Sequence, residues 1–426
     1  MRIACISGTS LVHGVPMRTT TLRAVALTAA ILPAFAVAQT LSFDQALKLA
    51  VQRSEAARAG RAAAMSASEF AQAAGQLPDP MLRAGIENLP VTGPDRFSTT
   101  RDSMTMKRVG ISQEWLSTDK RAARASAARA VAEREAVQAN VAEAEARLQA
   151  ASAYLDAWYA DAALKLTSQT EHHLHEEFEA ARARLAAAKG ASAEALQLSA
   201  ARGMAEDESE EARQQQAAAL VALQRWVGFR PDVLEPVASL GVVDEQAYVL
   251  RHPAVVSLQR DVEVARQNAA VAAKERTPNW TWELSYGQRT NYSDMVTVGV
   301  SIPLQISPAQ RQDRETASKM ALVDKAEAAL AEGSRAASAE YSAFSSDAER
   351  LKQRIVRYRA SVVAPALQRT AAATAAYRSN DAPLSSLFEA RHAEVEAERK
   401  LLSLQRDLAK VQAQLSFKPL AQGDVQ

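Results

Sequence analysis

The sequence predicts a mainly α-helical protein with a small β part, built from two tandem copies of one unit. Its 426 residues are 48% hydrophobic but only 5% aromatic, with 15 glycines and 15 prolines, which is typical of long helices lying side by side. Residues 109–112 (VGIS) recur as 298–301 (VGVS), 189 residues later, and Leu198 recurs at the same distance as Leu387. Such a fixed offset indicates an internal duplication.

Charge and composition exclude several classes of function. The chain has 50 Lys and Arg against 49 Asp and Glu, so a net charge of +1 gives no reason to expect a nucleic-acid partner. A single cysteine excludes a disulfide framework. The sequence contains no phosphate-binding glycine loop and no nucleophile elbow, so we expect neither an enzyme nor a cofactor. A mean hydropathy of −0.20 argues against a helix of about 20 apolar residues.

The N-terminal segment has the features of a secretory signal peptide. Two arginines precede an apolar run from Ala24 to Ala36, and Ala36-Val37-Ala38 supplies the small residues of a cleavage site. The run is too short to span a bilayer. We therefore expect residues 1–38 to be removed, and both Met1 and Met17 remain candidates for the start.

Each repeat is predicted to contain a helix, two short strands, a very long helix and a shorter helix. The first repeat covers 39–228, with a β-hairpin at 80–116, a long helix at 118–188 and a helix at 191–227. A linker at 229–243 follows. The second repeat covers 244–418, with a β-hairpin at 278–304, a long helix at 308–378 and a helix at 383–416; a tail at 419–426 follows.

The long helices carry a coiled-coil spacing. Apolar residues from Val137 to Ala162 are separated alternately by four and three residues, and those from Ala337 to Val362 follow the same series. Neither glycine nor proline interrupts the first helix between Lys120 and Lys189. A helix of this length spans roughly 100 Å. Pro365 predicts a kink late in the second long helix.

The predicted strands alternate with a period of two. Trp280, Trp282, Leu284 and Tyr286 alternate with polar or small residues, and the valines and isoleucine of 296–302 do the same. One face is therefore apolar and aromatic, as in a sheet on a protein core or a hairpin facing lipid. Four strands cannot close a membrane barrel, so lipid contact requires several chains. Two chains would supply 8 strands and three would supply 12; periodicity does not choose between them.

These features together resemble the TolC family of outer-membrane efflux factors. Phe43-Asp44-Gln45-Ala46-Leu47 is similar to the family's opening helix, and Arg251-His252-Pro253-Ala254-Val255 to the start of its second half. Leu77-Pro78-Asp79-Pro80, Glu87-Asn88-Leu89-Pro90 and Lys120-Arg121 resemble the branch that serves heavy-metal efflux. The resemblance covers nearly the whole chain after residue 38.

The resemblance implies an assembly as well as a fold. Long coiled-coil helices would form a periplasmic α-barrel, and four strands per chain would contribute to a 12-stranded outer-membrane β-barrel in a homotrimer. A periplasmic membrane-fusion adaptor and an inner-membrane pump of the resistance-nodulation-division (RND) type would be its partners. It implies export of heavy-metal cations such as copper, silver, cobalt, zinc or cadmium. A duct for drugs or for type I protein secretion is an alternative, and a soluble periplasmic coiled-coil adaptor or scaffold is another.

Three sets of residues are candidates for function. Trp280, Trp282, Tyr286 and Tyr292 are candidates for an aromatic belt at the membrane interface, the alternative being an ordinary sheet core.

Acidic residues near the turns that follow the long helices are candidates for a periplasmic gate. Glu194, Asp381 and Glu389 lie there. Of the positions that match the family's gate aspartates, only Glu389 keeps a carboxylate. Converging carboxylates would attract cations and repel one another. The alternative is ordinary helix-terminal charge.

A histidine cluster at 171–177 is the candidate metal contact. His172 and His175 are three residues apart, which places them on one helix face. Two ligands on one face could hold a cation loosely in transit, with further ligands from another chain. The alternative is a solvated polar face.

Overall fold

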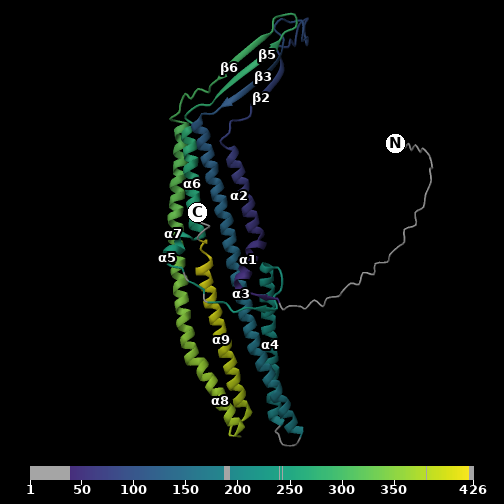
Figure 1. Cartoon of the computed structure of the whole chain (residues 1–426), viewed down its shortest axis with the longest axis vertical. Coiled ribbons are helices and arrows are strands. Elements are labelled where there is room, and N and C mark those ends of the chain that lie inside the picture. The colour runs from purple at the N-terminus through teal and green to yellow at the C-terminus, as the bar shows by residue number, and fades with distance from the viewer. Residues whose placement is uncertain (1–38, 187–191, 239, 242, 380, 422–426) are drawn as a thin grey trace, which may run out of the picture. The chain divides into compact units, whose positions relative to one another are not determined.

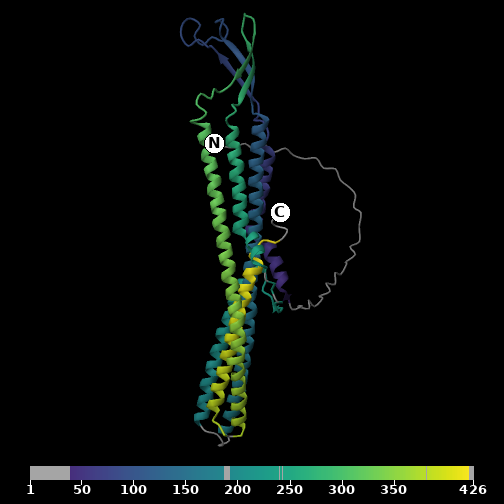
Figure 2. The same cartoon turned by 90° about the vertical axis from the view of Figure 1, so that its left-hand side faces the viewer.

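The computed structural model confirms a mainly helical protein with a small sheet at one end (Figures 1 and 2). It describes residues 39–186, 192–238, 240–241, 243–379 and 381–421. The expected signal peptide, residues 187–191 and the last five residues lie outside this description. The helices and strands below all belong to the unit Thr40–Gln426.

The elements of the first repeat and linker are β1 (Thr40–Leu41), α1 (Phe43–Arg53), α2 (Glu55–Ala73), β2 (Met81–Glu87), β3 (Met106–Trp115), α3 (Thr118–Ala186), α4 (Ser192–Val227) and β4 (Val233–Leu234). Those of the second are α5 (Glu245–Leu250), α6 (Pro253–Lys274), β5 (Trp280–Gln288), β6 (Met295–Ser301), α7 (Gln312–Tyr358), a π-helix (Arg359–Val363), α8 (Ala364–Arg378) and α9 (Leu384–Phe417).

Helix α3 is the central helix of the unit. It has 69 residues, about 104 Å at 1.5 Å per residue. Near the sheet it packs with α2 and α6, and α7 lies against α6; farther from the sheet it packs with α4 and α9, and α8 lies against α9 (Figure 1). Its heptad positions Leu148, Ala151 and Leu155 are at most 5% exposed. Small alanines between larger residues let these helices approach closely.

The opening helix of each repeat is broken, which corrects the expectation of one continuous helix. In the first repeat Ser54 leaves the helical conformation, and its side chain caps α2 by accepting a hydrogen bond from the Ala57 amide. In the second repeat His252 is extended because it precedes Pro253, the first residue of α6. Two different local signals thus produce the same break.

The second long helix is also interrupted. Instead of one helix over 308–378, α7 ends at Tyr358, and a π-helix at Arg359–Val363 leads into α8. Pro365 lies in the first turn of α8. Because proline cannot donate the hydrogen bond of a regular α-helical turn, the preceding turn widens. The second long helix also begins later than the expected residue 308, since residues 308–311 form turns before α7.

The predicted linker contains a short strand. Strand β4 pairs in parallel with β1, and both pack near Tyr154 of α3. The Tyr154 hydroxyl lies 2.8 Å from the carbonyl oxygens of Leu41 and Glu235 and donates a hydrogen bond shared between them. Burial raises the pKa of Tyr154 to about 12. This contact joins the start of the first repeat to the linker, which the sequence does not suggest.

The other sheet has the order β2-β3-β5-β6, and every pair is antiparallel. The hairpins of the two repeats meet at β3 and β5, where Val109 pairs with Tyr286 and Trp115 with Trp280. Strands β2 and β6 are the two edges. Within one chain, both edges leave backbone groups unpaired.

Candidate functional sites

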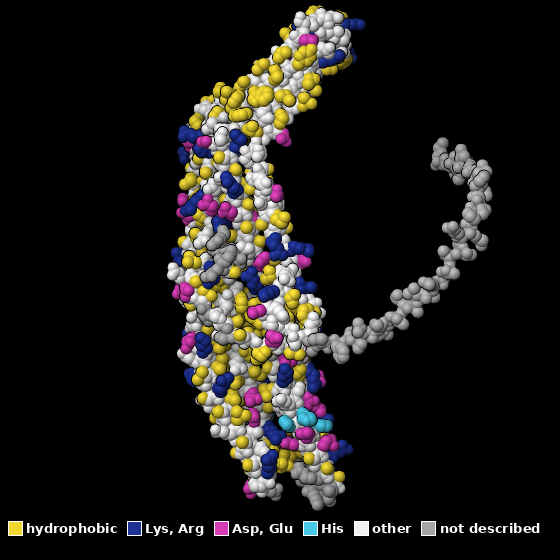
Figure 3. All heavy atoms as spheres, viewed as in Figure 1, with side chains coloured by type: hydrophobic (Ala, Val, Ile, Leu, Met, Phe, Trp, Pro, Cys, Tyr) yellow, Lys and Arg dark blue, Asp and Glu magenta, His cyan; other side chains and the backbone are white. Residues whose placement is uncertain are grey.

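One face of the four-stranded sheet is apolar and uncovered. Apart from Lys107 and Gln113 of β3, the register places on it the apolar residues Leu82, Ala84, Ile86, Val109, Ile111, Trp115, Trp280, Trp282, Leu284, Tyr286, Val296, Val298 and Val300. Val298 is 75% exposed and Leu82 is 74% exposed. Hydrophobic side chains cover this part of the surface in Figure 3. A large exposed apolar patch marks a surface that contacts lipid or another protein.

The opposite face of the sheet is polar and carries charged side chains as well as small ones. Arg108 binds the carboxylates of Glu87 and Glu283, and its Nε donates a hydrogen bond to the Ser285 hydroxyl at 2.7 Å. Gly110 allows close contact here, because a β-carbon at that position would lie 2.5 Å from Cβ of Ser285. The two faces of the sheet therefore differ in polarity over the length of the strands.

Aromatic side chains lie toward both ends of the sheet. The ring centroid of Trp280 lies 6.1 Å from that of Trp115 near the helices, with the two ring planes tilted by 43°. Tyr286 is hydrogen-bonded to Asp294 near the far loop, where Tyr292 contacts a guanidinium. Trp280 and Tyr286 are six residues apart, about 20 Å along a strand. Trp282 lies on the same face, whereas Tyr292 lies in the loop.

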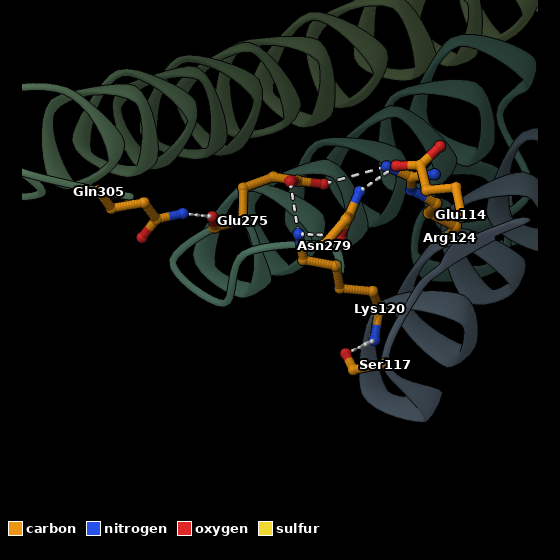
Figure 4. A network of polar contacts seen from close by, with 7 residues as sticks. All are labelled: Glu114, Ser117, Lys120, Arg124, Glu275, Asn279 and Gln305. Carbon is orange, nitrogen blue, oxygen red and sulfur yellow. Dashed lines mark hydrogen bonds and ion pairs between the residues drawn. The ribbon is translucent and has the colours of Figure 1, made fainter. Parts of the chain in front are cut away.

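A charged network fixes the joint between the sheet and the helices (Figure 4). The side chain of Lys120 is 3% exposed, and its ammonium donates to Glu275 Oε2 and Asn279 Oδ1, both at 2.8 Å. Arg124 binds the other carboxylate oxygen of Glu275 at 3.2 Å, and the Asn279 amide donates to Glu114 at 2.8 Å. The network joins the start of α3 to the end of α6, and thus one repeat to the other.

The electrostatics of this joint favour a charged Glu275. Burial raises the pKa of Glu275, but hydrogen bonds from Lys120 and Arg124 outweigh burial, so the pKa lies below its ordinary value. Sequence reasoning singled out Lys120 only through a family resemblance. A buried lysine needs an acidic partner, yet the sequence alone could not identify Glu275, which is 155 residues away.

The two helical hairpins meet at the end of the unit remote from the sheet. Leu198 of α4 and Leu384 and Leu387 of α9 form one buried cluster. Leu198 and Leu387 are the residues that recur at the repeat offset, and each is at most 1% exposed. Arg391 of α9 binds Glu177 of α3 beside this cluster. Equivalent positions of the two repeats thus hold the hairpins together.

The candidate gate residues lie at these hairpin ends. Asp381 follows α8, and its carboxylate accepts a hydrogen bond from the Ser379 hydroxyl at 2.6 Å. Glu389 is on the second turn of α9, 3.9 Å from Arg369, and its side chain is 73% exposed. Glu194 is in the first turn of α4, with its side chain outside the description. Within one chain, Asp381 and Glu389 thus have different polar partners.

The candidate metal residues lie on α3 with their side chains exposed to solvent. His172 is 3.4 Å from Glu176 with a side chain 69% exposed, and His175 is exposed as well. Leu174 between them is buried and directs the histidines to solvent. Within the part of the chain that the structure describes, no group of three or more His, Cys, Asp or Glu side chains could hold a metal ion.

Comparisons with known proteins find similarity only at the level of structure. No protein-family model matches the chain, and no curated protein sequence matches it. The outer membrane protein VceC of Vibrio cholerae superposes with a TM-score of 0.71 at 18% identity over 88% of this chain and 96% of its own. CusC gives 0.71 at 14% identity over 88% and 91%, and the Campylobacter jejuni outer membrane channel CmeC gives 0.71 at 11% over 88% and 85%.

The chain has a TolC-like fold. The match extends over most of both chains, so it includes the long helices as well as the sheet. At these identities the similarity concerns architecture alone. No helix among the described residues is both long and apolar enough to cross a bilayer.

Proposed function

We propose that the protein is the outer-membrane channel of a tripartite efflux system and acts as a homotrimer. Three copies of the four-stranded sheet supply 12 strands for one membrane β-barrel. The helices continue this barrel as a hollow α-helical duct through the periplasm. The solved structures with the same fold, among them the channel CmeC, support this assignment.

The single observation that carries the proposal is an apolar sheet face without a cover and with two open edges. Strands β3 and β5 have 10 and 9 residues, a length suited to a tilted strand across a bilayer. An open edge is unfavourable in hydrocarbon because unpaired backbone groups find no water there. Pairing β6 of one copy with β2 of the next removes every edge and turns the apolar face to lipid.

The proposed duct does not catalyse a reaction. The side of the sheet bearing Arg108 faces the water-filled interior, and the aromatic side chains lie at the two bilayer surfaces. Energy must come from a partner, for which an inner-membrane RND pump linked by a periplasmic adaptor is the proposed arrangement. Asp381, Glu389 and Glu194 of three copies would line the inner end as an acidic ring.

Heavy-metal cations are the proposed substrate. The support is the resemblance of the Leu77–Pro80, Glu87–Pro90 and Lys120-Arg121 segments to the metal-efflux branch. His172 and His175 would act only as transient contacts, together with residues of a partner, because their side chains are solvent-exposed. Drugs or secreted proteins are the alternative cargo.

The channel assignment is tested by mass and conductance. We expect a detergent-solubilised particle with the mass of three chains that forms pores in a planar bilayer. A protein that stays soluble and monomeric without detergent would instead be a periplasmic adaptor or scaffold.

The substrate is tested separately in a deletion strain. We expect lower tolerance to at least one of copper, silver, cobalt, zinc and cadmium, restored by the wild-type gene. Unchanged tolerance to all five metals would remove the metal assignment while leaving the channel assignment intact.

A further inference from the structure

Methionine is concentrated at one end of the four-stranded sheet. Seven of the nine methionines follow residue 38, and three of these seven, Met104, Met106 and Met295, lie at the end of the sheet remote from the helices. Met106 begins β3 and Met295 begins β6, so each repeat supplies one of them to a strand. The loops of both hairpins are at this end (Figure 1).

Met106 and Met295 project from the polar face of the sheet. The register pairs Met106 with Glu87, which binds Arg108 on that face, and pairs Met295 with Gly287. Residues that pair directly across two strands project to the same side. Met295 is 46% exposed and Met106 is half-buried. In the proposed barrel both side chains would face the water-filled interior.

Gly287 brings these two side chains close to each other. The side chain of Met106 lies across β5, with its Sδ 2.8 Å from the position that a β-carbon of Gly287 would take. A larger residue at 287 would displace this sulfur. Met295 is directly opposite Gly287, and the β-carbons of such pairs are about 4.5–5.5 Å apart. The side chain of Met295 is therefore within reach of the Met106 sulfur. Met106 and Met295 are named here the thioether pair.

The carboxylates nearest to the thioether pair on this face are bound to arginine. Glu87 lies 2.5 Å from Arg108, and Glu283 lies 3.0 Å from the same guanidinium. A cation at the pair would therefore meet sulfur before it met an uncompensated carboxylate. Soft thioether ligands select Cu(I), whereas harder divalent cations favour carboxylate, carbonyl and water oxygens. Ag(I) has the same charge and the same preference for sulfur.

Packing explains the thioether pair less well than binding does. Methionine commonly fills irregular gaps in apolar cores. Met295, however, is almost half exposed, and the side chains next to the pair include the ion pair of Glu87 and Arg108. Met81 provides a comparison at the other end of the same face. It is 55% exposed, and its cross-strand partner is Ser112, which carries no sulfur.

We propose that the thioether pair is a transit site for soft monovalent cations, Cu(I) or Ag(I), inside the membrane barrel. Each copy in a trimer supplies one pair, and Met104, which is 59% exposed in the adjoining loop, adds a third thioether. This inference rests on the proposed channel function and narrows its cargo from five metals to two. Two or three neutral ligands hold an ion weakly, as conduction requires, since an ion must leave a transit site as readily as it enters.

Silver binding to the purified protein in detergent tests the site. Nitrate replaces chloride in the buffer, because silver chloride is insoluble. The double variant Met106→Leu/Met295→Leu removes both sulfurs and keeps their size and apolar character. Loss of groups that merely support a metal ligand costs about 10–100-fold in affinity, so we expect the double variant to bind Ag(I) at least about tenfold more weakly in calorimetry. Met81→Leu is the matched control and should bind Ag(I) as the wild type does.

Peroxide footprinting of the wild-type protein locates the bound ion. Exposed methionines are oxidised to sulfoxides, which mass spectrometry measures residue by residue. A sulfur that binds silver is protected, so Ag(I) should slow the oxidation of Met106 and Met295 and leave that of Met81 unchanged. Equal effects of Ag(I) at all three methionines, or equal affinity of the wild type and the double variant, would overturn the site.

Conductance in planar bilayers separates this inference from the channel assignment. In nitrate solution, Ag(I) should lower the conductance of wild-type pores and have less effect on pores of the double variant. If pores form and silver affects both proteins equally, the transit site is wrong and the channel stands. If no pores form, the proposed function fails, and the footprint alone decides whether the thioether pair binds silver.

Discussion

Replacing Lys120 by methionine removes the centre of the joint between sheet and helices while keeping the aliphatic part of the side chain. Loss of one partner of a buried ion pair costs about 3–5 kcal/mol, because the remaining charge is uncompensated. Here Glu275 is 32% exposed and keeps its contact with Arg124, so we expect a smaller cost of about 2 kcal/mol in the free energy of unfolding. At about 2 cal/mol/K per residue, the thermal midpoint falls by about 2–3 °C.

The assay is thermal unfolding of the purified protein in detergent, followed by intrinsic fluorescence and by circular dichroism. Lys165→Met is the matched control, since the Lys165 side chain is 74% exposed and contacts Asp161 at 2.7 Å. Exposed pairs of this kind contribute less than about 1 kcal/mol. The double variant with Glu275→Gln should cost less than the sum of the two single variants, because both lose the same contact.

Acid titration provides a second readout of the same network. The folded-state pKa of Glu275 lies below its ordinary value because of Lys120 and Arg124, against the effect of burial. Its contribution to stability is therefore present above the ordinary pKa and is lost as the pH falls through the folded-state pKa. In the Lys120→Met protein, the free energy of unfolding should decrease less as the pH falls through this range. A Lys120→Met protein that is no less stable than Lys165→Met would refute the assignment of the joint.

Three further outcomes follow from the same structure. Val298→Arg on the apolar face should destabilise the membrane-embedded protein by about 2–4 kcal/mol and prevent trimer formation. Thr297→Arg on the polar face should assemble normally. Equal behaviour of the two variants in gel filtration would contradict the lipid-facing orientation. His252 is 7% exposed, and burial lowers its pKa. The protein should therefore lose stability as the pH falls below the ordinary histidine value of 6.5, because the buried imidazole must then take up a proton. His252→Gln should weaken this pH dependence, measured as the thermal midpoint at a series of pH values. Glu389→Gln should reduce the preference of the channel for cations in planar bilayers. Arg369→Ala should increase this preference, since Arg369 is 3.9 Å from Glu389. Unchanged reversal potentials in both variants would exclude the Glu389 carboxylate from the gate.

Local patterns were sufficient for much of the fold. A period of 3.5 residues identifies the buried stripe of α3, where Ala151 and Leu155 are completely buried. A period of two separates the apolar and polar faces of β5, because successive side chains in a strand point to opposite sides. The helix breaks differ in this respect. Pro253 is a visible signal for one of them, whereas Ser54 becomes a cap only when the chain turns there.

The candidate sites were less accessible to sequence reasoning. Trp280, Trp282 and Tyr286 were placed on one face by alternation alone. The network around Lys120 and Glu275 was not, because it depends on β3 lying next to β5, a pairing between repeats. The gate carboxylates stay a prediction, since their convergence requires several chains.

The sequence by itself determined the direction in which each side chain points from its helix or strand, since that direction follows from periodicity and proline position. Only the tertiary structure decided which elements are neighbours: β3 beside β5, β1 beside β4, and Leu198 beside Leu387. The physical reason is that backbone periodicity is local, whereas the choice of partner depends on packing between segments far apart in the chain. The buried charge of Lys120 can be explained only at that level.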